Sequence, residues 1–246
     1  MSRLPVVLAT ALLLPRIVAA QVSYDRTIQF SGLTWRVKAS PNAGPGPNAF
    51  SDSVRTVRVD TRGRLRLRIV RIDGVWRCAE VVSVDSLGYG TYRFYLDSKV
   101  DHLDPNVVLG LFTWNDADPS YNNREIDIEF SRWGAADDPT NAQYVVQPFD
   151  TPGNLVRFTE PPMLRKSTHS FVWRPTEIDY QSLRGHLAVP SGPADVIAEL
   201  TQTSSSIPPA GGENVRINLW LYQGSPPTKN RSTTVVIDRF EFVPAS

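Results

Sequence analysis

The sequence is poor in the residues that cross-link proteins or bind metals. Cys78 is its only cysteine, so no disulfide can form within the chain. The chain holds 3 His, none of them in a His-x-His or His-x-x-x-His pair, so we expect no catalytic metal. A protein of 246 residues must then be held together by its hydrophobic core, and we expect Cys78 to be buried and inert.

The sequence also lacks an excess of charge of either sign. The 26 basic and 25 acidic residues leave a net charge of +1, which does not indicate nucleic acid or an anionic membrane as a partner. One local exception is the segment 64–69, where arginine alternates with Leu or Ile. This period of two is typical of a half-buried strand with one solvated face. A site for an anionic glycan is the alternative.

No apolar run beyond the first twenty residues is long enough to suggest a membrane span. Those residues combine a basic Arg3, an apolar stretch over 4–14, and Ala19 and Ala20 before Gln21, a pattern typical of a secretory signal peptide cleaved near Ala20. The apolar stretch is shorter than the roughly 20 residues of a membrane helix. We therefore expect residues 1–20 to be a signal peptide and the mature protein to be secreted.

The rest of the chain lacks any sustained helical stripe and has the pattern of an all-β protein. Short runs of alternating apolar residues are separated by turns, which accounts for much of the 20 Pro and 15 Gly. We see neither a repeat nor a shift in composition, so we expect residues 21–246 to form one domain, a two-sheet antiparallel β-sandwich of the jelly-roll type, with the last run closing a sheet. The main runs cover residues 34–38, 65–71, 91–96, 107–114, 125–130, 215–222 and 235–243.

Three acidic residues stand at alternate positions of one such run. On a strand, Glu125, Asp127 and Glu129 share one face, and the residues between them, Ile126 and Ile128, face the core. Like charges in a row repel one another, so a purely structural strand gains nothing from this arrangement. Glycoside hydrolysis uses such groups, because it needs a carboxylate and a carboxylic acid whose pKa values are pushed apart. The strand must lie in a concave sheet for Glu125 and Glu129 to converge on one bond.

The sequence resembles the family 16 glycoside hydrolases, whose signature is Glu-x-Asp-x-Glu, and residues 125–130 are similar to the version found in lichenases, the β-1,3-1,4-glucanases. The resemblance runs in matching order from about Phe30 to Val243. Besides the signature it rests on residues 89–92 (Tyr-Gly-Thr-Tyr), 110–114 (Gly-Leu-Phe-Thr-Trp), 169–173 (His-Ser-Phe-Val-Trp) and 218–220 (Asn-Leu-Trp).

The resemblance implies a jelly roll with a concave cleft and a retaining hydrolase acting on a β-linked polysaccharide such as a β-glucan. It implies that Glu125 is the nucleophile, Glu129 the general acid/base and Asp127 the residue that orients and tunes them. The same resemblance assigns substrate-binding roles to Glu80, Asn218 and Trp220. It requires no cofactor for catalysis, allows for a structural calcium ion, and leads us to expect a monomer.

The strand around Trp220 independently has the composition of a sugar-binding surface. Its polar and aromatic residues share one face, opposite Val, Ile and Leu, and sugar rings pack on aromatic faces while their hydroxyls need polar partners. We therefore assign Trp114 and Trp220 to the cleft, leave Phe112 undecided, and assign His169 to a structural hydrogen bond. We assign the remaining tryptophans considered, Trp35, Trp76 and Trp173, to the core.

Departures from the lichenase pattern leave the substrate open. Asn123 and Arg124 precede Glu125, where lichenases have a tryptophan two residues upstream, Val82 replaces an arginine, and residues 180–186 replace an Asp-Gly turn. Two other functions remain as alternatives. One is a transglycosylase, in which a sugar intercepts the same intermediate. The other is a non-catalytic carbohydrate-binding or cell-wall protein on the same fold.

Overall fold

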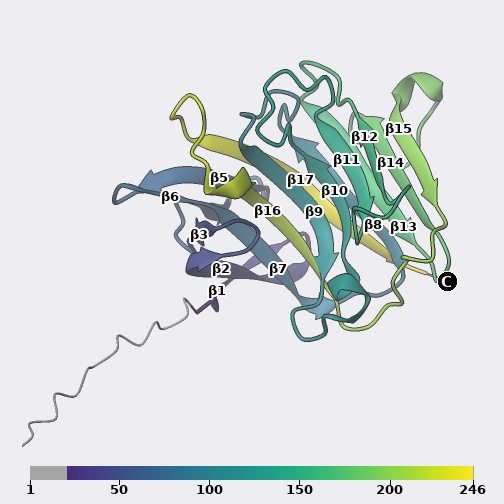
Figure 1. Ribbon diagram of the computed structural model, residues 1–246, viewed down its shortest axis with the longest axis horizontal. Coiled ribbons are helices and arrows are strands. Elements are labelled where there is room, and N and C mark those ends of the chain that lie inside the picture. Colours follow the sequence, from purple (N-terminus) through teal and green to yellow (C-terminus); the bar gives the residue numbers. More distant parts are fainter. Residues whose placement is uncertain (1–20, 246) are drawn as a thin grey trace, which may run out of the picture.

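The protein is a sandwich of two antiparallel sheets, shown by a computed structural model that describes residues 21–245 (Figure 1). The expected signal peptide, residues 1–20, lies outside the described residues. Both the two-sheet architecture and the all-β composition agree with the alternation in the sequence. Within residues 21–245, no helix has the length and apolar character needed to cross a membrane.

The first sheet has nine strands in the order β1-β2-β7-β16-β9-β10-β11-β12, with β3 paired to β2. Strands distant in sequence lie side by side in it, as β16, β9 and β10 do in Figure 1. Its strands are β1 (Ser23–Phe30), β2 (Leu33–Ala43), β3 (Asn48–Phe50), β7 (Ala79–Ser86), β9 (Val107–Trp114), β10 (Ile126–Phe130), β11 (Ala142–Val146), β12 (Leu155–Phe158) and β16 (Asn214–Leu221).

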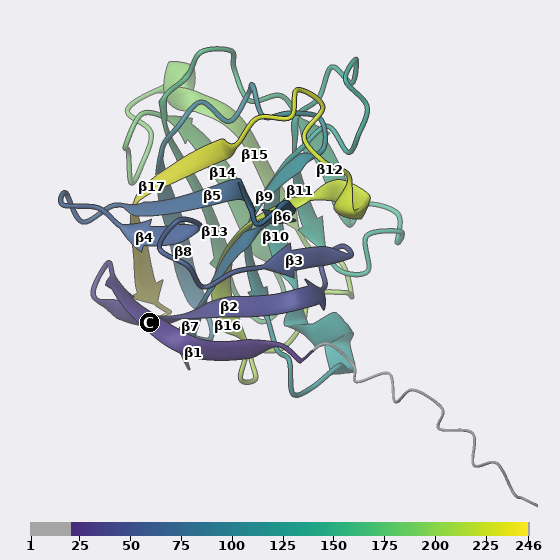
Figure 2. The ribbon, with the colours of Figure 1, turned by 90° about the vertical axis from the view of Figure 1, so that its left-hand side faces the viewer.

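The second sheet has eight strands in the order β15-β14-β13-β8-β17-β5-β4, with β6 paired to β5. Figure 2 shows β4 and β5 above the purple and blue strands that begin the first sheet. Its strands are β4 (Val57–Val59), β5 (Leu65–Ile72), β6 (Val75–Arg77), β8 (Gly90–Asp97), β13 (Lys166–Trp173), β14 (Ile178–Arg184), β15 (Val196–Gln202) and β17 (Thr233–Pro244).

The last strand does not close a sheet, contrary to the expectation from sequence. β17 lies in the interior of the second sheet, between β8 and β5. Three successive residues, Val235, Val236 and Ile237, are buried, so both faces of the strand are covered. Alternation predicts which face a residue takes, but it does not say which strand lies alongside.

Aliphatic and aromatic side chains together fill the space between the sheets. Tyr92 stacks on Phe171 with ring centroids 4.7 Å apart, and Trp35 and Trp173 are fully buried as expected. Trp76 is only half-buried and packs at the margin of this core. Such rings bury large areas and prefer offset or edge-to-face contacts. This core gives the first sheet a rigid base.

The two expected inert groups are confirmed. Cys78 is fully buried, and burial raises the pKa of its thiol to about 12, so it stays protonated. His169 is also fully buried, with Nδ1 2.8 Å from the Ser182 hydroxyl and Nε2 2.8 Å from the Ser167 hydroxyl. Burial lowers the pKa of His169 to about 3, so the imidazole is neutral and structural.

The arginine-rich segment is a half-buried strand, as its period predicts. Along β5, Leu65, Leu67 and Ile69 are fully buried, while the arginines between them are only partly buried. Arg64 forms ion pairs with Asp60 and Asp97, and Arg66 also pairs with Asp60. Two of these arginines thus have carboxylate partners within the protein.

Candidate active site

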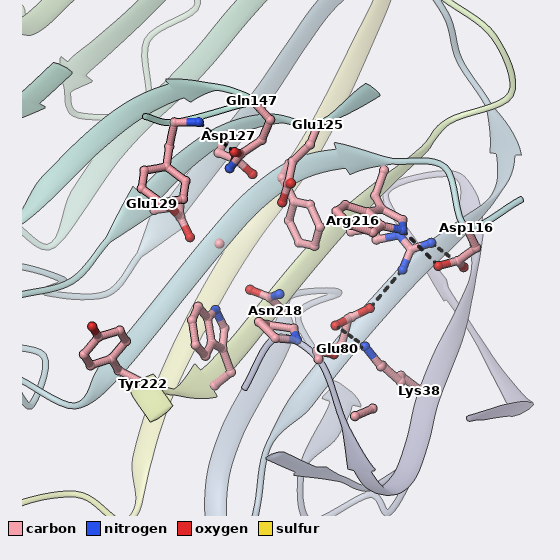
Figure 3. Close-up of a pocket in the computed structure, with 18 of the residues that line it drawn as sticks. Lys38, Glu80, Asp116, Glu125, Asp127, Glu129, Gln147, Arg216, Asn218 and Tyr222 are labelled. Carbon is pink, nitrogen blue, oxygen red and sulfur yellow. Dashed lines mark hydrogen bonds and ion pairs between the residues drawn. The ribbon is translucent and has the colours of Figure 1, made fainter. Parts of the chain in front are cut away.

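A cleft of about 860 Å³ lies on the exposed face of the first sheet (Figure 3). Side chains from both edges and from the middle of this sheet line it, because alternate residues of each strand point to that face. They include Tyr24, Lys38, Glu80, Phe112, Trp114, Asp116, Glu125, Asp127, Glu129, Trp133, Gln143, Gln147, Phe149, Arg216, Asn218, Trp220 and Tyr222.

The three acids of the Glu-x-Asp-x-Glu motif all line this cleft. Glu125 stands just before β10 in an extended conformation, and Asp127 and Glu129 follow on the same face of β10. Figure 3 shows all three on one side of the cleft. The predicted alternation is confirmed, because the residues between and after them, Ile126, Ile128 and Phe130, have no exposed surface.

Burial strongly raises the pKa values of the three acids. Burial, and then the charge of Glu129, raises the pKa of Glu125 to about 8, although a hydrogen bond with Asp127 acts in the opposite direction. Burial raises the pKa of Glu129 to about 7 and that of Asp127 well above its usual range. The charges of both glutamates add to the shift of Asp127. The three groups therefore retain protons near neutral pH and titrate as a coupled set.

Amide side chains on β11 and just beyond it orient two of the acids. Gln143 donates from Nε2 to Glu129 Oε2 at 2.8 Å, and its own Oε1 accepts from Trp133 Nε1 and from Arg157 Nη1, both at 3.1 Å. The amide is thus fixed from both ends with its donor toward Glu129. Gln147 makes a longer contact, 3.4 Å, to Asp127 Oδ2. Donors favour the charged carboxylate, and Gln143 holds down the pKa of Glu129.

Asn218 faces the acids across a glycine. The register places Gly110 of β9 between Asn218 on β16 and Glu129 on β10. A Cβ at Gly110 would lie 2.5 Å from Asn218 Oδ1, so the position has no room for a larger residue. Asn218 is 2% exposed, and its Oδ1 has no hydrogen-bonding partner among residues 21–245. This oxygen is positioned to accept a hydrogen bond from a ligand in the cleft.

A chain of charged residues forms one end of the cleft. Glu80 is almost fully buried and accepts from Lys38 Nζ at 3.0 Å and from Arg216 Nη1 at 3.3 Å. Arg216 in turn pairs with Asp116, which also accepts from Trp114 Nε1 at 3.0 Å (Figure 3). Glu80 therefore lies in the cleft as the sequence suggested, but both of its oxygens are already engaged by cations.

Aromatic side chains form the other walls. Trp220 packs edge-to-face on Trp133, which also contacts Tyr222. Trp220 is 8% exposed and belongs both to the cleft wall and to the packed core, whereas Trp114 is more open. Phe112, undecided from sequence, is buried yet lines the cleft, and Phe149 is 61% exposed there.

All seven residues singled out from sequence are brought together in this cleft. These are Glu80, Trp114, Glu125, Asp127, Glu129, Asn218 and Trp220. Sequence reasoning missed Gln143, Trp133, Phe149 and Lys38 as cleft residues. Alternation along β11 and β2 carried a signal for two of them, because Gln143 and Lys38 sit on faces opposite aromatic or aliphatic neighbours.

Among residues 21–245, no group of three or more His, Cys, Asp or Glu side chains is placed to hold a metal ion. The structural calcium ion allowed by the sequence resemblance stays a prediction. The acids of the cleft can serve proton transfer and nucleophilic attack without a metal.

Comparison with solved structures shows the fold. No family model and no curated protein sequence matches the chain. A β-glucanase of Bacillus licheniformis superposes with a TM-score of 0.64 and 19% identity, covering 94% of this chain and 100% of that one. A β-1,3-1,4-glucanase (lichenase) from a mouse hindgut metagenome gives 0.62 and 18%, covering 92% and 99%.

A third similar structure comes from a study of endo-acting O-glycanases that members of the human gut microbiota express to initiate mucin breakdown. It has a TM-score of 0.64 and 14% identity, and the match covers 92% of this chain and 99% of that one. These likenesses extend over nearly the whole of each protein. The chain therefore has the β-jelly-roll fold of the β-glucanases.

Proposed function

We propose that the protein is an endo-acting glycoside hydrolase that cleaves a β-linked polysaccharide of the β-glucan type with net retention. The observation that carries the proposal is the set of three acids, Glu125, Asp127 and Glu129, which line one cleft with raised pKa values. Acids whose pKa values are shifted by burial and by specific neighbouring charges, and which lie in a cleft, are typical of functional sites.

In the proposed reaction, Glu125 attacks the anomeric carbon while Glu129 donates its proton to the departing glycosidic oxygen. This forms a glycosyl-enzyme ester and frees the first product. Glu129, now a carboxylate, takes a proton from water as that water attacks the anomeric carbon, which releases the second product and regenerates Glu125. Two inversions at one carbon give net retention.

Protons must be distributed correctly before the first step. Burial raises the pKa values of both Glu125 and Glu129, so burial alone does not decide which of the two carries the proton. Positive charge that develops on the sugar ring favours ionised Glu125, and the basic leaving oxygen favours a protonated Glu129. Asp127, which is 3% exposed, supports this state by hydrogen bonding to Glu125 in its own protonated form.

The remainder of the cleft suits a neutral polysaccharide. Its walls alternate aromatic rings with fixed polar groups, which match the apolar faces and the hydroxyls of sugars. The cations Lys38 and Arg216 are both paired with carboxylates, which leaves little free positive charge to hold an anionic sugar. The three solved relatives include two β-glucanases, which supports a β-glucan as the first substrate to test.

Secretion and a monomeric state belong to the same proposal. The secretory pattern of the first twenty residues supports export, where polysaccharide substrates are met. Transglycosylation would use the same residues and differ only in the acceptor, so product analysis with and without added acceptor sugars separates the two reactions.

A substrate panel tests the proposal. The mature chain would be incubated with β-1,3-1,4-glucan, β-1,3-glucan, galactan, carrageenan and an O-glycosylated mucin, and new reducing ends would be measured. We expect release from a β-glucan, with the β-anomer appearing first by NMR. Binding without any new reducing ends would instead favour the non-catalytic alternative, and an initial α-anomer would exclude retention.

A further inference from the structure

The segment immediately before Glu125 has an unusual backbone. Four consecutive residues of the short helix η1 (Ser120–Arg124) have positive φ angles: 53° at Tyr121, 52° at Asn122, and 57° at both Asn123 and Arg124. Residues with a Cβ disfavour this left-handed region, which glycine usually occupies. Asparagine tolerates it, but tyrosine and arginine do not. Such a turn persists only where its surroundings hold it.

Arg124 ties this left-handed turn to the loop that precedes β16. Its side chain is buried, its Nη1 lies 2.6 Å from Asp118 Oδ2, and its Nε donates to the Pro209 carbonyl at 3.0 Å. The guanidinium lies against Gly211, where a Cβ would stand 2.7 Å from Nε. It also lies 5.3 Å from the centroid of the Tyr121 ring. The turn is therefore fixed through one side chain from several directions.

The backbone of the turn is anchored to the end of β9. Thr113 Oγ1 donates to the Arg124 carbonyl at 2.7 Å, and the backbone N–H of Asn115 donates to the Asn123 carbonyl at 2.7 Å. Asn123 Nδ2 returns a bond to the Asn115 carbonyl at 2.8 Å. The chain thus enters β10 from a fixed point, and Glu125 is the first residue after it.

We propose that Arg124 is a positioning residue for Glu125: by holding the left-handed turn against the 209–211 segment, it fixes the backbone from which the Glu125 carboxyl enters the cleft. This rests on the proposed function, in which Glu125 is the nucleophile. A displacement of about 1 Å from attack geometry can cost about 100-fold in rate. Neither Asn218 nor Trp220, the cleft residues of β16, forms a hydrogen bond with this turn, so substrate affinity is expected to change little.

Arg124→Ala is the first test. With β-1,3-1,4-glucan as substrate we expect kcat to fall about 10- to 100-fold while KM stays within about twofold. The step itself is followed by mass spectrometry, using an activated 2-deoxy-2-fluoro-β-cellobioside that labels the nucleophile. Labelling of Glu125 should slow by the same factor as kcat. A loss of stability alone would lower the amount of active protein and leave kcat per active site unchanged.

Two further variants test the same role of Arg124 by other means. Gly211→Ala displaces the guanidinium without removing it, and should reproduce part of the loss if Arg124→Ala does not fold. Adding Tyr121→Gly to Arg124→Ala removes the strain of positive φ at position 121, and should restore part of the labelling rate. Arg26→Ala is the control, because Arg26 also clamps backbone, at the Asp52 and Val57 carbonyls.

The outcomes separate the two proposals. If the unmodified chain turns over glucan and labels, but Arg124→Ala labels at the same rate, Arg124 does not position the nucleophile and the inference is wrong. A kcat loss that Tyr121→Gly does not recover, and that Arg26→Ala matches, also overturns it. If the unmodified chain neither labels nor hydrolyses any glycan, it is the proposed function that fails.

Discussion

Carboxyl groups are buried both inside the cleft and away from it, and their surroundings differ. In the cleft, amide side chains donate to Asp127 and Glu129, and all three acids share the space with the aromatic walls. Glu160, in the loop after β12, is 1% exposed, and neither of its carboxylate oxygens has a hydrogen-bonding partner among the described residues. Burial, and then the charge of Asp101, raises its pKa to about 8.

The comparison shows that a raised pKa does not by itself mark an active site. Loss of water is the main cause of the raised pKa values in both regions, yet Glu160 does not line the cleft that holds the three acids. Access for a ligand, and a second titratable group facing the same space, distinguish the cleft. Substitutions in the two regions should therefore separate activity from stability.

The largest effect is expected from Glu125→Gln. The amide keeps the shape but cannot form the glycosyl-enzyme bond, so turnover should fall by at least about 1,000-fold while glycan binding is retained. Stability at pH 8 should rise slightly. The pKa of Glu125 in the folded protein lies above its unfolded value, so stability is lost as pH rises through the folded pKa. Glutamine does not titrate, so the variant avoids this loss. Glu199→Gln, on the exposed strand β15, is the control for turnover.

Glu160→Gln should do the reverse, leaving kcat within about twofold and changing the dependence of stability on pH. Glu160 is protonated in the fold below its raised pKa, so the variant should match the unmodified protein at pH 5. At pH 9 it should be more stable by on the order of 2 kcal/mol, because it avoids burying a charge. Thermal unfolding from pH 5 to 9 measures this, and parallel pH curves for the two proteins would refute it.

A smaller effect is expected from Gln143→Met, which removes the amide donor from Glu129. The pKa of Glu129 should rise, because the charged form loses a hydrogen bond. Activity needs Glu129 protonated, so the alkaline limb of the kcat/KM profile should move to higher pH by roughly 1 unit. Gln181→Met on β14 should leave the profile in place. A shift to lower pH would mean that Gln143 does not stabilise the charged form.

Much of this arrangement could be predicted from local sequence pattern. The bounds of β9 agree with the expected run over 107–114, and alternation correctly divided the faces of β10 and β16. These features depend only on the period of two along a strand. The grouping of all the singled-out residues in one cleft follows once their strands are neighbours.

What the sequence did not reveal depends on contacts between distant segments. The interior position of β17, the ion pairs that occupy Glu80, and the amide of Gln143 beside Glu129 are all set by partners more than ten residues away. The left-handed turn at 121–124 was also missed, because neither tyrosine nor arginine signals positive φ. Only the folded chain brings Arg124 to the Pro209 carbonyl.

Azide rescue of Glu129→Ala tests the central assignment most directly. This variant lacks the proton donor, so natural substrates should react slowly, while an activated aryl β-glycoside should still form the intermediate on Glu125. Azide, which needs no general base, should then release the sugar faster. We expect a β-glycosyl azide, identified by NMR. An α-glycosyl azide would contradict the account, because it would make Glu129 the nucleophile and Glu125 the acid/base.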